Sequence, residues 1–315
     1  MMNIRSLDDG AGQHSVFPAH DAERSEHIFR DNGRSDPRSS LQGQDHEKKN
    51  NIALAPIGVF DSGAGGLTIL SALQKELPNE HFIYLGDTAN CPYGTRSEEE
   101  IIELSLQACR FLINQGVKLI VVACNTASQA ALSVLRSTYS IPFVGVVPAV
   151  KPAARVTRRG RIGIAATNQA IKASYLHHLI DDFASDVQVY AVGCPELVTL
   201  VEHGELDGPH VDTVLRNALK PLTDKDVDVL VLGCTHFPAL RPAIEQVMGK
   251  HVQVIDSGSA IARRTHSILD TERLARPFDG QEGNVSIWCS GEAEEFSRVA
   301  SAVLGYEVQA SQSTF

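Results

Sequence analysis

The stretch KLIVVACNTAS, residues 118–128, begins as an apolar run and ends in a cysteine, an asparagine and a threonine. A nearly continuous apolar run of this length is typical of a parallel strand that is covered on both faces. The residues after Cys124 predict a helix from Asn125 to Ser137. A strand that leads directly into a helix is the repeating unit of an α/β fold.

The same arrangement recurs in VLVLGCTHFP, residues 229–238, where Cys234 ends the apolar run and Pro238 fits the start of a second helix, up to Met248. Amphipathic helices lie between the strand-like runs, and the clearest extends from Ser97, with Glu100 completing a capping box, to near Gly116. The alternation predicts open, mainly parallel α/β sheets. The strand-like runs are residues 57–60, 81–86, 118–123, 142–147, 161–166, 187–192, 227–233 and 252–256.

Four of these runs recur in the same order along the chain. IGVFDSG resembles IGIAATN at an offset of 105 residues, YLGD resembles YAVG at 106, VVACNT resembles VLGCTH at 110, and GVVP lies opposite VIDS at 109. The repeat predicts two pseudo-symmetric α/β lobes with an active site in the cleft between them. The expected first lobe comprises residues 52–148 and 257–315, and the second comprises residues 149–256. Cys124 and Cys234 would then face each other across a ligand.

The composition excludes several classes of protein. A chain of 315 residues with 43% hydrophobic residues can form a large core, and its net charge of −10, without basic clusters, argues against binding to nucleic acid. No apolar run reaches the roughly 18 residues of a membrane span, and no secretory signal is evident, so we expect a cytoplasmic protein. Six cysteines are too sparse for a disulfide framework. Residues 1–51 are polar and charged, which predicts a flexible tail.

A thiol at the start of a helix feels the positive end of the helix dipole, so the sequence predicts lowered thiol pKa values at Cys124 and Cys234. The stretch DSGAGG, residues 61–66, also follows a strand and opens a helix. Its glycines would let backbone amides approach a small carboxylate. Neither a GxGxxG pattern nor a P-loop lysine is present, so NAD and ATP are not supported.

Five motifs in this order resemble those of the glutamate racemase family: DSGAGGLTIL, DTANCPYGTRS, ACNTAS, VEHGE and GCTHFP. The resemblance covers about residues 57–265. It implies a cofactor-independent racemase, without a metal, that supplies D-glutamate for peptidoglycan. It also implies a homodimer, and the N-terminal extension suggests activation by a UDP-muramyl precursor.

The resemblance further implies roles for individual residues. Cys124 would act on D-glutamate and Cys234 on L-glutamate, one as thiolate base and the other as thiol acid. Asp61, Glu202 and His236 would assist proton transfer. Asn90 departs from the family, which often has arginine there. The residues implied in binding the substrate are Asp61, Ser62, Tyr93, Gly94, Asn125, Thr126, Thr235 and His236.

Three other functions remain open from the residues alone. The substrate could be another acidic amino acid such as aspartate, or the protein could bind a dicarboxylate without catalysis. A dithiol redox enzyme would instead need the two thiols close enough to form a disulfide. Among the remaining candidates, Cys109 is expected to be core filler, and His177 with His178 a surface pair. Lys151 has no phosphate-binding motif that would support pyridoxal phosphate.

Overall fold

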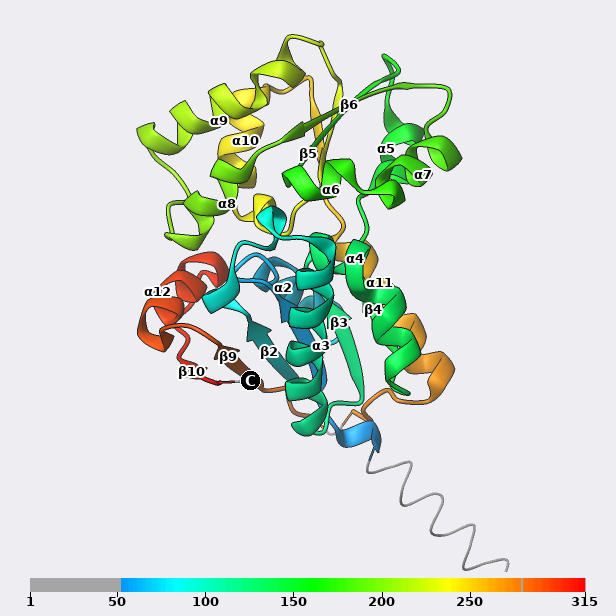
Figure 1. Ribbon diagram of the computed structural model, residues 1–315, viewed down its shortest axis with the longest axis vertical. Helices are drawn as coiled ribbons and strands as arrows, with labels where there is room; N and C mark the ends of the chain where they lie inside the picture. Colours follow the sequence, from blue (N-terminus) through cyan, green and yellow to red (C-terminus); the bar gives the residue numbers. More distant parts are fainter. Residues whose placement is uncertain (1–51, 279, 315) are drawn as a thin grey trace, which may run out of the picture. The chain divides into compact units, whose positions relative to one another are not determined.

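Two parallel β-sheets, each covered by helices on both faces, make up the computed structural model, which describes residues 52–278 and 280–314 (Figure 1). The predicted α/β architecture is confirmed, whereas the tail predicted for residues 1–51 lies outside the described residues. None of the helices in this described part of the chain is long and apolar enough to cross a membrane.

The larger sheet has six parallel strands in the order β10-β9-β2-β1-β3-β4. Alternate side chains of each strand point to opposite faces, as strand geometry requires. The strands are β1 (Ile57–Asp61), β2 (Phe82–Gly86), β3 (Leu119–Val122), β4 (Phe143–Gly145), β9 (Val285–Cys289) and β10 (Ala310–Gln312).

Two hydrophobic cores flank the larger sheet. Ile57 and Val59 of β1 pack in one core with the helices α2 (Leu67–Glu76), α11 (Gly258–Glu272) and α12 (Ala293–Leu304). On the opposite face Phe60 packs in a second core with α3 (Glu98–Asn114) and α4 (Asn125–Thr138). Burial on both faces explains why these strands read as continuous apolar runs in the sequence.

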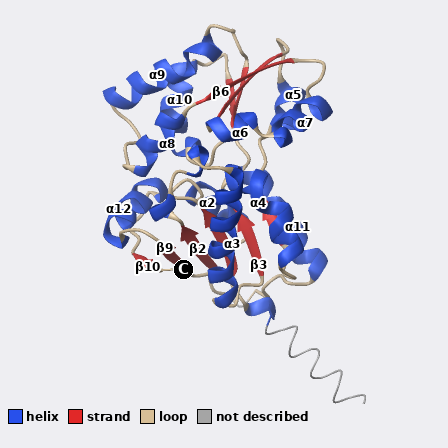
Figure 2. Ribbon diagram, in the orientation of Figure 1, coloured by secondary structure: helices blue, strands red, loops and turns tan. Residues whose placement is uncertain are grey.

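The smaller sheet has four parallel strands in the order β6-β5-β7-β8. Its strands are β5 (Arg161–Ala166), β6 (Gln188–Gly193), β7 (Val229–Leu232) and β8 (Gln253–Ile255). Figure 2 shows helices on both sides of these strands. One core contains α8 (Pro195–Glu202), α9 (Pro209–Thr223) and α10 (Arg241–Met248), and the other contains α5 (Val150–Val156), α6 (Asn168–Lys172) and α7 (Ser174–Phe183).

The two sheets repeat one topology. The order β2-β1-β3-β4 in the larger sheet corresponds strand by strand to β6-β5-β7-β8 in the smaller one, so the predicted repeat and its two lobes are confirmed. The larger sheet continues beyond the repeat through β9 and β10, which the sequence patterns did not predict. The limits assigned to the two lobes stay a prediction.

Candidate active site

Both cysteines of the repeat stand just beyond the carboxyl ends of equivalent strands. Cys124 follows β3 and Cys234 follows β7. In each sheet this strand lies beside the first strand of the repeat, where the strand order changes direction along the chain. Crevices at such switch points are the usual ligand sites of open α/β sheets.

One small cavity is lined by both cysteines. Its volume is about 10 Å³, which is room for roughly one water molecule. The cavity as it stands is therefore too small for an amino acid. The other residues that line it are Ser62, Pro92, Tyr93, Gly94, Asn125, Thr126, Thr167, Val198, Thr235 and His236. The predicted residues Asp61 and Glu202 contact this lining rather than belong to it.

Cys124 is the N-cap residue of α4. Its Sγ accepts a hydrogen bond from the Ala127 amide at 3.5 Å, and its thiol donates to Ser62 Oγ at 3.6 Å. Burial, together with the nearby Asp61 carboxylate, nevertheless raises the pKa of the Cys124 thiol to about 12. The prediction of a lowered thiol pKa is therefore wrong at Cys124, because loss of hydration outweighs the helix start.

Cys234 has a different setting. The helix expected from Pro238 is replaced at its start by a short 3₁₀ turn, Phe237–Leu240, and α10 begins only at Arg241. The neighbour of the Cys234 thiol is instead His236, whose Nδ1 lies 3.6 Å from Sγ. A histidine, rather than a helix start, is thus placed to exchange a proton with Cys234.

His236, which is buried, pairs with the half-buried Glu202, the last residue of α8. Nε2 lies 2.5 Å from Glu202 Oε1, which also accepts a hydrogen bond from the Ala64 amide at 2.8 Å. Burial alone would lower the pKa of His236, but its contacts with Cys234, Cys91 and Glu202 raise it well above 6.5. Burial would raise the pKa of Glu202, yet the contacts with His236 and Ala64 lower it. Both shifts favour the charged forms of the two side chains.

Asp61, at the end of β1, joins the two lobes. Its Oδ1 accepts from the Gly63 amide at 2.8 Å, and its Oδ2 accepts from Thr235 Oγ1 at 3.0 Å. Complete burial raises the pKa of Asp61, although the charge on His236 and these hydrogen bonds oppose the rise. This carboxyl group is therefore more easily protonated than an exposed one.

The glycines of DSGAGG make room for side chains of the site. A Cβ atom on Gly63 would lie 2.0 Å from Glu202 Oε1, and one on Gly65 would lie 2.4 Å from His236 Nδ1. The amides of Gly63 and Ala64 donate to Asp61 and Glu202. We expected the amides of this loop to face the carboxylate of a ligand. That expectation is wrong for the Gly63 and Ala64 amides, which donate to carboxylates of the protein itself.

The loop after β2 supplies Tyr93 and Gly94. The Tyr93 hydroxyl donates to Asp87 Oδ2 at 2.6 Å, and Asn90 Nδ2 donates to Asp87 Oδ1 at 3.0 Å. Asn90, the position that departs from the family pattern, thus helps to hold the carboxylate that orients Tyr93. A Cβ on Gly94 would lie 2.8 Å from Thr167 Cβ, so this glycine permits close approach of the smaller-sheet lobe.

Thr167 is a cavity residue that the sequence reasoning missed. It follows β5 and caps α6, and its Oγ1 lies 3.1 Å from Thr126 Oγ1. The sequence repeat could have identified Thr167, because the offset that aligns IGVFDSG with IGIAATN places Thr167 opposite Ser62.

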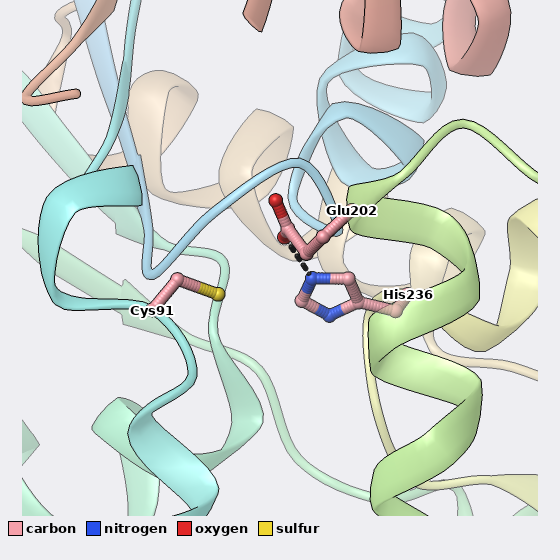
Figure 3. A group of neighbouring side chains, drawn as sticks. All are labelled: Cys91, Glu202 and His236. Atoms are coloured by element: carbon pink, nitrogen blue, oxygen red, sulfur yellow. Dashed lines mark hydrogen bonds and ion pairs between the residues drawn. The ribbon is translucent and has the colours of Figure 1, made fainter. Parts of the chain in front are cut away.

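A further sulfur borders the site. The ligand atoms of Cys91, Glu202 and His236 lie within 4.8 Å of one another, the only such group of three among the described residues that could hold a metal ion. Figure 3 shows the Cys91 sulfur pointing toward the His236 ring. The other candidates lie elsewhere, since Cys109 is buried in α3 and the Lys151 ammonium rests over the Phe183 ring at 4.5 Å.

Comparison with known proteins gives consistent matches. Residues 61–265 match the Asp/Glu/hydantoin racemase family. A glutamate racemase of Deinococcus radiodurans is 46% identical over 233 residues, covering 73% of this chain and 80% of the relative. The crystal structure of a Bacillus anthracis glutamate racemase isoform aligns with a TM-score of 0.74 at 35% identity, covering 82% of this chain and 97% of that one. The Escherichia coli glutamate racemase, in complex with L-glutamate and the activator UDP-MurNAc-Ala, aligns with a TM-score of 0.72 at 36% identity, covering 81% and 97%.

Proposed function

The chain belongs to the Asp/Glu/hydantoin racemase family, and from this premise we propose that it interconverts L-glutamate and D-glutamate without a cofactor. The observation that carries the proposal is the pair of thiols, Cys124 and Cys234, that reach one cavity from equivalent strands of the two lobes. Inversion at a carbon centre requires a base on one face and an acid on the other. A repeated fold supplies both.

In this mechanism one cysteine, as thiolate, takes the α-proton, so that a C–H bond breaks and an S–H bond forms. The other cysteine, as thiol, returns a proton to the opposite face of the carbanion. We assign Cys124 to D-glutamate and Cys234 to L-glutamate. Asp61 lies close enough to Cys124 to affect its titration, and His236 with Glu202 serves Cys234.

The ammonium group of the substrate would help to form the Cys124 thiolate. In the closed cavity the pKa of Cys124 is about 12, so its thiol form dominates at neutral pH. A positive charge within a few ångströms favours the thiolate and lowers that pKa. The buried Oδ1 of Asn125 has no hydrogen-bond partner among the described residues, and a buried acceptor of this kind suits an ammonium donor.

The α-proton of an amino acid is weakly acidic, so the site must stabilise the charge that develops on the substrate carboxylate. Ser62, Thr126 and Thr235 line the cavity, and the Ser62 and Thr126 hydroxyls are the donors available, since the Thr235 hydroxyl donates to Asp61. Fixed donors in a closed, dry site stabilise such charge more strongly than water does. The cavity of about 10 Å³ is too small for glutamate. The lobes would open to admit the substrate and then close around it, and only then would these donors surround it.

We also propose that a UDP-muramyl precursor of the UDP-MurNAc-Ala class regulates this chain and that its D-glutamate serves peptidoglycan synthesis. A cavity of about 410 Å³ lies beside the connections between the lobes and contains Val146, Ser257 and Gly258. Ser257 Oγ donates to Val147 O at 2.5 Å, which links the two connections. Lys75 and Arg263 on its wall suit a diphosphate, and Cys234 reaches the same wall.

Two further expectations stay proposals. A homodimer would be tested by size-exclusion chromatography with light scattering on the full chain. A cytoplasmic location would be tested by fractionation of cells that produce the protein.

The deciding experiment incubates purified, reduced protein with L-glutamate or D-glutamate in deuterated water and follows optical activity and deuterium at the α-carbon. Racemisation with incorporation of solvent deuterium supports the proposal. Exchange with aspartate alone would favour the racemase of another acidic amino acid. Binding of glutamate without exchange would favour a dicarboxylate-binding protein, and formation of a Cys124–Cys234 disulfide on oxidation would favour a dithiol redox enzyme.

A further inference from the structure

Cys91, Glu202 and His236 bring together a sulfur, a carboxylate oxygen and an imidazole nitrogen, all within 4.8 Å of one another (Figure 3). These are the three donor types that bind Zn²⁺ in proteins. The ligand atoms of a tetrahedral zinc site lie about 3.5 Å apart, given zinc–ligand distances of about 2.0 to 2.3 Å. The contact of 2.5 Å between Glu202 Oε1 and His236 Nε2 is shorter than this spacing and has to lengthen to admit an ion between them.

The three residues come from both lobes. Cys91 lies between the 3₁₀ turns Thr88–Asn90 and Tyr93–Thr95, in the segment that follows β2 of the larger sheet. Glu202 ends α8 and His236 precedes the turn Phe237–Leu240, both in the smaller-sheet lobe. An ion bound to all three would therefore connect the two lobes across the active site.

An entry path for a cation is present. A second cavity of about 320 Å³ is lined by Cys91 and Glu202 and also by His203, Glu292 and Glu295. Three carboxylates at the wall of one cavity raise the local concentration of cations. Two of the three proposed ligands, Cys91 and Glu202, thus line an acidic pocket.

We propose that Cys91, Glu202 and His236 bind a thiophilic divalent cation of the Zn²⁺ class and that the bound ion inhibits the enzyme. The inhibitory part rests on the proposed racemisation. An ion bound to residues of both lobes holds the cavity closed. The cavity must open to admit the substrate, so the bound ion blocks entry. The reaction itself uses no metal in this scheme.

Binding is tested first, with Co²⁺ added to the full-length, reduced protein. A thiolate bound to Co²⁺ gives a charge-transfer absorption in the near ultraviolet that carboxylate and histidine ligands do not give. Residues 1–51 contain histidines but no cysteine, so this absorption does not report on them. The wild type and the control Cys109→Ser should show the absorption, and Cys91→Ser should lose it. Equal absorption in Cys91→Ser would overturn the site and point to Cys124 or Cys234.

A second measurement needs no variant. Alkylation of the wild-type protein by iodoacetamide, followed by peptide mass mapping, should show that Zn²⁺ slows modification of Cys91 at least several-fold, and that a chelator reverses this. Unchanged labelling of Cys91 at saturating Zn²⁺ would contradict the proposal even if Cys91→Ser failed to fold.

Inhibition is tested with the racemase assay, each variant being compared with its own rate in the presence of chelator. Zn²⁺ should inhibit the wild type reversibly. Half-inhibition of Cys91→Ser should require a Zn²⁺ concentration at least about tenfold higher. Loss of even a supporting residue of a metal site costs about 10- to 100-fold in affinity. Cobalt binding through Cys91 without inhibition would overturn the inhibitory part alone. Absence of racemisation in every sample would count against the proposed function, while the cobalt and labelling results would still decide the metal site.

Discussion

Ser62 and Thr167 occupy equivalent places in the two lobes: each directly follows the first strand of the repeat, and each lines the cavity that both cysteines share. Ser62 accepts a hydrogen bond from Cys124, and Thr167 bonds to Thr126. Both hydroxyls are thus directed toward side chains at the start of α4. The repeat therefore duplicates the polar wall of the site as well as its cysteines.

Thr167→Val should lower kcat/KM by about fivefold, because it removes a buried hydrogen bond worth about 1 kcal/mol and leaves the Thr126 hydroxyl with fewer partners. Thr167→Ser keeps the hydroxyl and should retain most of the activity. Steady-state kinetics in both directions checks this. Equal rates for the valine and serine variants would mean that the Thr167 hydroxyl has no part in the site.

Cys124→Ser and Cys234→Ser should each reduce turnover by about 10²- to 10⁴-fold, the usual contribution of a general acid or base. Binding of glutamate should persist, because each thiol is replaced by a hydroxyl of similar shape. Circular dichroism measures turnover, and calorimetry measures binding. Cys289→Ser is a suitable control, since Cys289 is buried at the end of β9 and belongs to the core rather than to the cavity. Near-normal turnover in either cavity variant would refute the two-thiol mechanism.

The pair of His236 and Glu202 should govern how stability depends on pH. The pKa of His236 is raised above 6.5, so its stabilising contribution is complete below that value and is lost as pH rises through the raised pKa. The pKa of Glu202 is lowered from 4.5, so its contribution is present above that value and is lost as pH falls through the lowered pKa. Both contributions are complete only between about pH 4.5 and pH 6.5, so the pair stabilises the fold most in that mildly acidic range.

Glu202→Gln removes the carboxylate that helps to raise the pKa of His236, so the alkaline loss of stability should be smaller and should be complete at a lower pH. Urea unfolding measured between about pH 5 and pH 10 would show this shift. The matched control is Glu205→Gln, since Glu205 pairs with His210 at 2.7 Å but both side chains are largely exposed. Exposed pairs contribute about 0 to 1 kcal/mol, so the control should change little. Identical pH profiles for the two variants would contradict the assignment.

The sequence was sufficient to predict strands β1 to β8, the repeat and the shared cavity, because buried parallel strands appear as apolar runs and equivalent strands carry equivalent residues. The sequence did not reveal β9. Its residues VSIWC are interrupted by a serine, so they do not form a continuous apolar run, and the strand pairs with β2 outside the repeat. The titration of Cys124 was also missed. A helix start is visible in sequence, but the burial that outweighs it depends on how the lobes close. Likewise, only the fold brings Cys91 to Glu202 and His236.

Gly65→Ala should inactivate the enzyme by displacing His236. The added Cβ would lie 2.4 Å from His236 Nδ1 and 2.7 Å from the His236 backbone nitrogen, so both the ring and its main chain must move. Overpacking of this kind costs about 1 to 3 kcal/mol of stability. Gly116→Ala provides the comparison, because Gly116 has φ +77 and no atom near an added Cβ. That variant should lose about 1 kcal/mol through backbone strain but keep its activity. Activity should be compared under conditions in which both variants are equally folded. If Gly65→Ala then loses no more activity than Gly116→Ala, the position of His236 does not limit the reaction.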